Sequence, residues 1–403
     1  MAQPHASSSK QPSQKVQVSL TNELIGRLKP AKVFHDAVER PPQPESPGLS
    51  HETQPRPHLP QITSLSFDDT GERCLTTGED EGFAIWDMRK GRKLKNFWSK
   101  KYGVGLGRFT HRSGNIVHAS TKVVADARAS EDTHALRYHS THDNKYLSYF
   151  KGHTARVRSL CMNPIDDTFL SAGDDQTVRL WDLRMPECKG VLNAMGGPVI
   201  AAFDNTGMVF AVACSVTKTL ALYACASMET DPFIFTGLYD PALEEISQPP
   251  PPINVTSLQI SNNGQYILVG TDSDVHYLYD AFDLKPIRRL TGHRPLGKNS
   301  GEEVSFTADS RYVVSGSAEG GVYFWSLPAD KLDAAETDAN GKVVKAAKTL
   351  QADVVIHSSD PSVRFTSRVV KFNPRFSVLA VGGEELSFWL PAQDEEAKIE
   401  AGW

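Results

Sequence analysis

One pattern of residues recurs along this chain, and it restricts the possible folds more than any other feature. Residues 62–87 contain an alternating apolar segment, a polar turn, a segment of small residues, an acidic turn and a segment ending in Trp-Asp, and residues 157–182 repeat this order almost position for position. Weaker copies follow the same order, which indicates a repeat architecture. The aromatic residues that close the third segment of each copy are Trp86, Tyr138, Trp181, Tyr223, Tyr279, Trp325 and Trp389.

The spacing of these copies fits one architecture. The two shortest intervals, from Tyr138 to Trp181 and from Trp181 to Tyr223, match the roughly 40 to 45 residues of a four-stranded propeller blade, and the longer ones need only loop insertions. Period-two alternation, as in VRLWD at 178–182, favours strands, and helical periodicity is scarce. The sequence therefore predicts an all-β protein, a seven-bladed WD40 β-propeller.

The ends of the chain predict how the ring closes. The residues that follow the last repeat are acidic and have no strand pattern, so the seventh blade shows three of its four strands. An open ring would expose a sheet edge. The only short apolar segment before the first repeat is AKVFHD at 31–36, and we expect this N-terminal strand to close the propeller.

Composition assigns the remaining segments. Ser, Gln and Pro dominate the start of the chain, and seven prolines fall within 39–60, too many for a β-ladder. Within a long insertion before the seventh blade, 342–350 is the candidate outer strand of the sixth blade. We expect a disordered tail at 1–20, a propeller at 21–391 with a Pro-rich linker at 39–60 and an inter-blade insertion at 328–364, and an acidic tail at 392–403.

Two sets of polar residues have the spacing of the hydrogen-bonded tetrad of WD blades, in which Asp anchors His and the His ring contacts Ser and, through it, Trp. The interval of six residues between the acid and the Trp also recurs at Asp80 and Trp86. A catalytic triad should occur once, so we interpret these residues as structural. They are His153, Ser171, Asp175 and Trp181 in one repeat and His293, Ser315, Glu319 and Trp325 in another.

The sequence offers no motif for catalysis, a cofactor or a metal. It contains no GxSxG elbow, HExxH, P-loop or helix-opening GxGxxG. The five cysteines include no CxxC pair, and His134, His139 and His142 fall on different faces of a strand and in a turn. We therefore expect neither enzyme activity nor a bound cofactor or metal.

Composition and charge narrow the classes of protein to which this chain can belong. Hydrophobic residues make up 39% of the chain, enough for a core, and no apolar run approaches the roughly 18 residues of a membrane span. The first residues lack the apolar core of a secretion signal, so we expect an intracellular protein. The formal net charge of -5 argues against coating nucleic acid by bulk charge.

Against this negative background, two segments at 98–111 and 135–160 combine cations with aromatic residues. As a group they suggest an anionic partner such as a phosphopeptide, whereas singly they are ordinary solvated residues. Arg156 is the strongest candidate, because it follows a Gly-His turn at the start of an inner strand, where side chains approach the channel mouth. The candidate cations are Lys100, Lys101, Arg108, Arg137, Lys145, Lys151, Arg156 and Arg158.

Several motifs in and around these segments lie outside the generic blade pattern. The chain carries SKKYGV at 99–104, RFTH at 108–111, HDNKYL with YF and GH within 142–153, PIDDTFLSAG with VRLWDLR within 164–184 and FWLP at 388–391. With them the sequence, from about residue 20 to 391, resembles the Swd-two/WD-repeat-eighty-two family. That family is the WD-repeat subunit of the COMPASS histone H3 lysine-4 methyltransferase complex and, in fungi, of the cleavage and polyadenylation factor.

The resemblance implies a nuclear, non-catalytic scaffold. Its expected partners are the methyltransferase catalytic subunit with the other COMPASS subunits, cleavage and polyadenylation factor subunits, a phosphatase-containing termination module, and RNA polymerase II phosphorylated on its C-terminal repeat. The chain departs from the family pattern in its Pro-rich linker, after Leu327 and around 226–252. A stand-alone phosphopeptide-reading module and an RNA-binding propeller are the alternatives, and the negative net charge counts against the second.

Overall fold

The computed structural model describes most of the chain. The described residues are 19–39, 59–122, 133–193, 195–228, 231–296, 303–327, 334–336, 343, 345–358 and 367–392. Most of the expected disordered tail, Pro-rich linker and acidic tail therefore lies outside the described residues. No helix in these ranges is long and apolar enough to cross a membrane.

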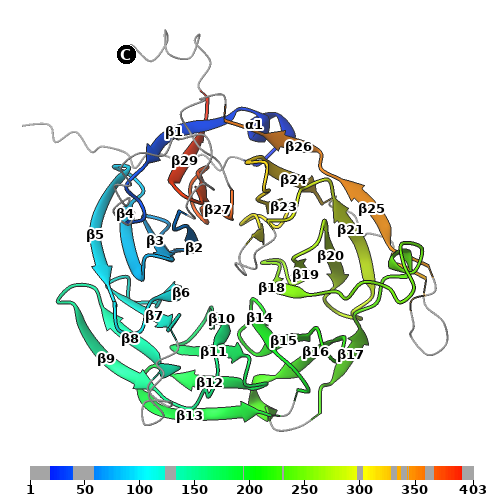
Figure 1. Cartoon of the computed structure of the whole chain (residues 1–403), viewed down its shortest axis with the longest axis horizontal. Coiled ribbons are helices and arrows are strands. Elements are labelled where there is room, and N and C mark those ends of the chain that lie inside the picture. Colours follow the sequence, from blue (N-terminus) through cyan, green and yellow to red (C-terminus); the bar gives the residue numbers. More distant parts are fainter. Residues whose placement is uncertain are drawn as a thin grey trace, which may run out of the picture.

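Seven sheets, antiparallel except for one added strand in blade five, form a ring, so the predicted seven-bladed propeller is confirmed (Figure 1). Blade one contains β2 (Ile62–Phe67), β3 (Arg73–Gly78), β4 (Gly82–Asp87) and β5 (Arg92–Trp98). Blade two contains β6 (Gly105–Phe109), β7 (Asn115–Ala119), β8 (Leu136–Ser140) and β9 (Lys145–Phe150). Blade three contains β10 (Val157–Met162), β11 (Thr168–Gly173), β12 (Val178–Asp182) and β13 (Met185–Leu192).

The remaining four blades follow in chain order. Blade four contains β14 (Val199–Phe203), β15 (Val209–Cys214), β16 (Thr219–Ala224) and β17 (Ile234–Gly237). Blade five contains β18 (Val255–Ile260), β19 (Tyr266–Thr271), β20 (Val275–Asp280), β21 (Pro286–Thr291) and β25 (Lys348–Gln351). Blade six contains β22 (Val304–Phe306), β23 (Tyr312–Ser315), β24 (Val322–Ser326) and β26 (Val354–Ile356). Blade seven contains β27 (Val369–Phe372), β28 (Leu379–Gly382), β29 (Leu386–Pro391) and β1 (Leu28–Phe34).

The N-terminal strand closes the ring, as predicted. β1 pairs antiparallel with β29, from Leu28 opposite Pro391 to Phe34 opposite Leu386, three residues earlier than the segment expected from the sequence. The short helix α1 (Asn22–Gly26), capped by the Thr21 hydroxyl, precedes β1 and packs beside β26 of blade six. Short 3-10 turns occur at Cys225–Ser227 and Pro241–Leu243.

The outer strand predicted at 342–350 is wrong for blade six. Within it, Lys348 begins β25, which lies parallel to β21 as a fifth strand on blade five. The outer strand of blade six is β26, whose Val354 and Ile356 pair with β24 and join the core shared by blades six and seven. The β-branched residues 354–356 therefore form the outer strand of blade six in preference to the more polar residues 348–351 before them.

Hydrophobic side chains from adjacent blades form the core. In one cluster Phe169 and Trp181 of blade three pack against Val117 and Leu136 of blade two. Four tryptophans that close third strands are fully buried, namely Trp86, Trp181, Trp325 and Trp389. This packing explains why the aromatic marker recurs in the sequence.

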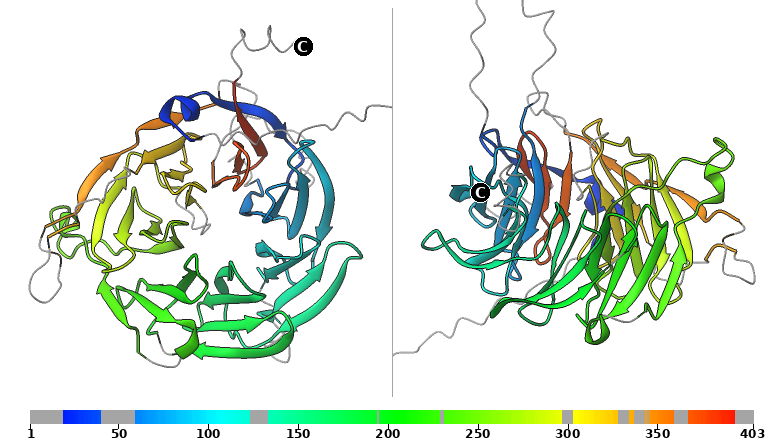
Figure 2. Two further views of the ribbon diagram at one scale, coloured as in Figure 1. Left: turned by 180° about the vertical axis from the view of Figure 1, so that it is seen from behind. Right: turned by 60° about the horizontal axis from the view of Figure 1, so that its bottom comes forward.

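Antiparallel pairing fixes the two faces of the ring (Figure 2). The connections between blades and the turns between second and third strands lie on one face, which we call the loop face. The turns that link first to second and third to fourth strands lie on the other, the turn face. Side-chain amides on the turn face bond to the next turn: Asn163 to the Gly207 carbonyl (3.1 Å), Asn205 to Asn262 (2.8 Å), Asn262 to Ala308 (2.9 Å) and Asn373 to Gly71 (2.7 Å).

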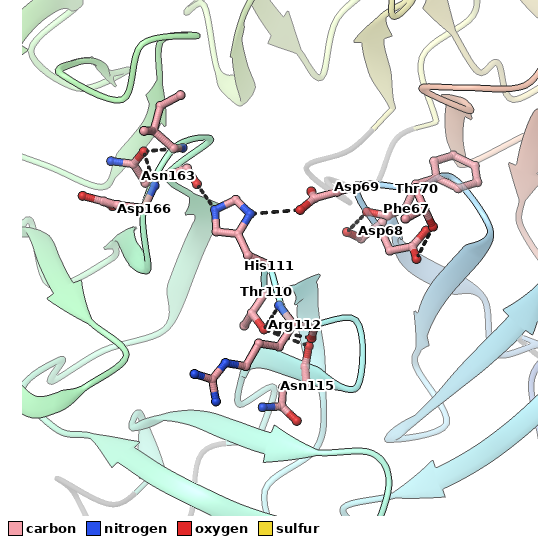
Figure 3. Close-up of polar contacts among 12 residues, drawn as sticks. Phe67, Asp68, Asp69, Thr70, Thr110, His111, Arg112, Asn115, Asn163 and Asp166 are labelled. Carbon is pink, nitrogen blue, oxygen red and sulfur yellow. Dashed lines mark hydrogen bonds and ion pairs between the residues drawn. The ribbon is translucent and has the colours of Figure 1, made fainter.

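In blade two a histidine makes this connection (Figure 3). His111 Nδ1 lies 2.9 Å from Asp69 Oδ2 of blade one, and its Nε2 lies 3.0 Å from the Asn163 carbonyl oxygen of blade three. The hydrogen bond to Asp69 is the main reason that the pKa of His111 is raised, and partial burial opposes it. One side chain thus links three consecutive blades.

Candidate functional site

The four polar residues expected in blade three lie in one hydrogen-bonded chain. His153 Nδ1 is 2.7 Å from Asp175 Oδ2, His153 Nε2 is 2.6 Å from Ser171 Oγ, and Trp181 Nε1 donates to Ser171 Oγ at 2.8 Å. Burial disfavours the Asp175 carboxylate, but hydrogen bonds with His153, the Thr154 N–H and Thr177 outweigh it and lower its pKa to about 2. Because Ser171 is fully buried, its hydroxyl cannot reach a substrate.

The second expected set does not form the same chain. Ser315 Oγ lies 3.1 Å from His276 Nε2, and His293 Nε2 instead lies 3.2 Å from the Ser273 carbonyl oxygen. The rings of His276 and His293 stack with centroids 4.2 Å apart. His276, on β20 of the preceding blade, therefore makes the contact to Ser315 that the sequence assigned to His293.

The acid and tryptophan of this set also have other partners. Glu319 Oε1 accepts from Arg294 Nη1 at 3.1 Å on the surface, and Trp325 Nε1 donates to the Thr291 carbonyl at 3.0 Å. The exposed Glu319 side chain pairs with a neighbouring cation instead of anchoring a buried ring. The tetrad prediction is corrected for His293, Ser315, Glu319 and Trp325.

Among the candidate cations, Arg156 is exposed on the loop face at the start of β10. Within the described residues its side chain forms no hydrogen bond or ion pair. Lys100, Lys101 and Lys151 also lie exposed in connections between blades on this face. Lys100 Nζ is 3.2 Å from Glu39 Oε2. The loop face therefore brings four of the eight candidates to one side of the ring.

Two further candidates line the central channel. Arg108 donates to the Leu160 carbonyl at 3.0 Å and to Ser64 Oγ at 2.9 Å, and Arg158 forms an ion pair with Asp174. They border a cavity of about 270 Å³. Arg108 and Arg158 are thus anchored channel residues, whereas Arg156 lies exposed just before β10.

The other two candidates do not join this group. Arg137 is 1% exposed, with its guanidinium carbon 3.8 Å from the centroid of the Tyr102 ring, so it cannot act as an open surface cation. Lys145 begins the outer strand of blade two on the turn face, opposite Ser140, and lies 3.8 Å from Asp143. The sequence pattern grouped them because it separates neither buried from exposed cations nor one face of the ring from the other.

Two positively charged features were not predicted from the sequence. Lys371 on β27 lines the same cavity as Arg108, and its signal in the sequence is that it is the one charged residue of the apolar strand VVKF. Residues 88–101 contain seven Lys and Arg and no carboxylate, and most of them lie on or beside β5. A count of charge along the chain in short windows would have found the second feature.

Within the described ranges, no group of three or more His, Cys, Asp or Glu side chains could hold a metal ion. The buried Ser171 and His153 are engaged with each other and with Asp175 and Trp181.

Comparisons with known proteins agree with this architecture. The family model described as WD domain, G-beta repeat matches residues 144–182 and 284–326. WD repeat-containing protein 82 of Drosophila melanogaster is 36% identical over 94% of this chain and 99% of its own length. Set1 complex component swd2 of Schizosaccharomyces pombe is 33% identical over 82% of this chain and 92% of its own length, and COMPASS component SWD2 of Saccharomyces cerevisiae is 29% identical over 82% and 90%.

These similarities extend well beyond a few generic blades, since each covers more than four-fifths of both chains. They agree with the resemblance seen in motifs such as SKKYGV at 99–104 and HDNKYL at 142–147. The chain belongs to the family of WD-repeat propellers that includes WD repeat-containing protein 82 and the Swd2 components of the Set1 and COMPASS complexes.

Proposed function

We propose that this chain is a non-catalytic scaffold subunit of a nuclear histone H3 lysine-4 methyltransferase complex of the COMPASS type. The observation that carries the proposal is nearly full-length similarity to proteins named as Set1 complex and COMPASS components. The geometry is compatible with it, because the conspicuous Ser, His and Asp side chains of blade three are buried and bonded to one another.

Reconstitution tests this assignment. The tagged chain is co-expressed with the catalytic subunit of the methyltransferase and the other core subunits, and the mixture is separated by size-exclusion chromatography. We expect the chain to elute with the catalytic subunit in one peak, and removing the chain should reduce the amount of intact complex. Elution of the chain alone, with the complex intact in its absence, contradicts the proposal.

A finer proposal is that the same propeller serves mRNA 3′-end processing and transcription termination, and that it links them to phosphorylated RNA polymerase II. A phosphoserine carries about -1.5 to -2 charges and three acceptor oxygens, which an arginine can meet with paired donors. Arg156 supports this role, because it is exposed on the loop face in the same connection as Lys151, and the preceding connection between blades carries Lys101. The same exposed arginine also supports the second candidate function, a stand-alone phosphopeptide-reading module.

A charge reversal with a matched control tests phosphopeptide binding. Arg156→Glu should weaken binding of a phosphorylated polymerase-tail peptide by about tenfold or more, since a hydrogen bond to a charged group contributes about 1.5–3 kcal/mol, and added salt should weaken it further. Lys101→Glu should act in the same direction. Arg112→Glu makes the same charge change on the turn face, where Arg112 is exposed, and should have no effect. Equal affinity for phosphorylated and unphosphorylated peptides contradicts this role.

A further inference from the structure

The outer strand of blade two presents large apolar side chains to solvent. On β9, Tyr146 is 38% exposed, Leu147 51% and Tyr149 44%. β9 is the last strand of its sheet, and in the described part of the chain no strand pairs with its outer edge (Figure 1). An unpaired edge with exposed apolar residues is a template for another strand.

The rings on this strand are held in place from beneath. Arg137 is buried on β8, with its guanidinium carbon 3.8 Å from the Tyr102 ring centroid and 5.9 Å from that of Tyr149. The Tyr146 and Tyr149 rings lie 5.5 Å apart. The contact with a buried guanidinium limits the rotamers of Tyr149, and Tyr146 packs against Tyr149, so less entropy is lost when a partner binds this pair.

A bulge leaves one apolar residue unopposed. Ser148 lies opposite Tyr138 and Tyr146 lies opposite His139, so Leu147 is the extra residue of β9. It is also the most exposed large hydrophobic residue of the strand. Bulges can blunt an edge with a charge or a twist, but this one displays a leucine between two tyrosines.

The ring already accepts an added strand at the equivalent position of another blade. β25 pairs in parallel with β21, the outer strand of blade five, from Arg288 opposite Lys348 to Thr291 opposite Gln351. Leu350 of the added strand packs partly buried against the core of blades five and six. An outer edge of this propeller can therefore hold a fifth strand through backbone pairing and one apolar anchor.

Cations surround both ends of β9. At one end lies Lys145, which is 3.8 Å from the Asp143 carboxylate, and Lys95 of β5 donates to the carbonyls of Thr141 (2.6 Å) and His142 (3.2 Å) just before it. At the other end Lys151 follows the strand, and Lys101 lies 4.9 Å from the Tyr102 ring centroid. This distribution complements an extended segment that carries negative charge.

We propose that the outer edge of β9 is a docking site for an extended acidic peptide segment of a partner protein. The segment adds as a fifth strand to blade two and covers Leu147 and Tyr149 with a large apolar side chain. This site goes beyond the proposed function: it recognises backbone, apolar surface and carboxylates, and it needs neither phosphate nor Arg156.

The proposal is tested by selecting peptides that bind the full chain from a phage-displayed library of random ten-residue peptides. We expect the selected peptides to be rich in Asp and Glu around at least one large apolar residue. Synthetic copies should bind Leu147→Asp and Tyr149→Asp at least about tenfold more weakly, because a buried charge replaces an apolar contact. Met185→Asp is the matched control, since Met185 is 47% exposed on β13, the outer strand of blade three. This variant should bind the peptides as tightly as the unmodified chain does.

Two further arms keep the test independent of the folding of the variants. Methylating alternate backbone nitrogens of the peptide should abolish binding to the unmodified chain, because it blocks pairing with the edge. Oligouridine should not compete with the peptides for binding to the chain. The proposal is overturned if no peptide is selected, if the peptides are not acidic, if Leu147→Asp and methylation have no effect, or if oligouridine binds and is lost in the same variants. Binding unaffected by Arg156→Glu separates this site from the phosphopeptide role.

Discussion

At the scale of single residues, equal spacing in the sequence leads to different contacts in different blades. The six-residue interval from acid to tryptophan correctly places Asp175 beside the buried His153. The same interval at Glu319 fails, because Glu319 bonds to Arg294 and His276 of the neighbouring blade reaches Ser315. Spacing within one repeat does not report which side chain of another repeat fills the space between blades.

Asp175→Ala should destabilise the whole propeller. The substitution leaves His153, whose side chain is fully buried, without its partner, and an unsatisfied buried group costs about 1–3 kcal/mol. Chemical denaturation measures the loss. Glu319→Ala is the matched control, because its partner Arg294 is exposed, and it should change stability by less than about 0.5 kcal/mol. Unchanged stability of Asp175→Ala with selective loss of partner binding would show that Asp175 has a binding role instead.

His111→Gln should destabilise the protein more at low pH than at high pH. The pKa of His111 is raised in the folded state, chiefly by its hydrogen bond with Asp69. The protonated ring therefore stabilises the fold fully below the ordinary histidine pKa of about 6.5, and this contribution is lost as the pH rises through the folded-state value.

Urea denaturation of wild type and His111→Gln measures this effect at pH values from about 5.5 to 8.5, because this range spans the ordinary histidine pKa of about 6.5. The difference in unfolding free energy should shrink as the pH rises, and Asp69→Asn should remove most of the pH dependence because it removes the carboxylate. A difference that grows with pH contradicts the contact seen in Figure 3.

At the scale of elements, the sequence predicts strands well where apolar residues alternate and poorly where two short candidates compete. The closing strand was predictable because one apolar segment precedes the first repeat, and it pairs with β29. In the insertion before blade seven, both 348–351 and 354–356 form strands. Which outer edge each strand joins depends on contacts between blades, and local pattern carries no such information.

Deleting residues 1–38 should destabilise the ring, whereas deleting 1–18 should not. The longer deletion removes β1 and α1, including the buried Ile25 and Leu28, each of which contributes about 1.5–3 kcal/mol by burial. With about 2 to 4 °C per kcal/mol in a large domain, the Tm should fall by at least about 5 °C. Equal melting of the two truncations would mean that β1 does not hold the ring closed.

At the scale of the whole molecule, the number of blades follows from the sequence, but the composition of shared surfaces does not. Arg108 and Lys371 meet at one cavity although they lie in blades two and seven. Arg137 and Lys145, close in sequence to Arg156, are respectively buried and on the turn face. Closure of the ring creates these neighbourhoods, so they become visible only in three dimensions.

The scaffold assignment is a property of the whole molecule, and affinity purification measures it most directly. The tagged full-length chain is purified from nuclear extract, and the copurifying proteins are identified by mass spectrometry together with histone H3 lysine-4 methyltransferase activity in the eluate. The account predicts that the catalytic subunit and its activity copurify with the chain and are lost with the 1–38 deletion. Recovery of the folded chain without a methyltransferase subunit or its activity would contradict it.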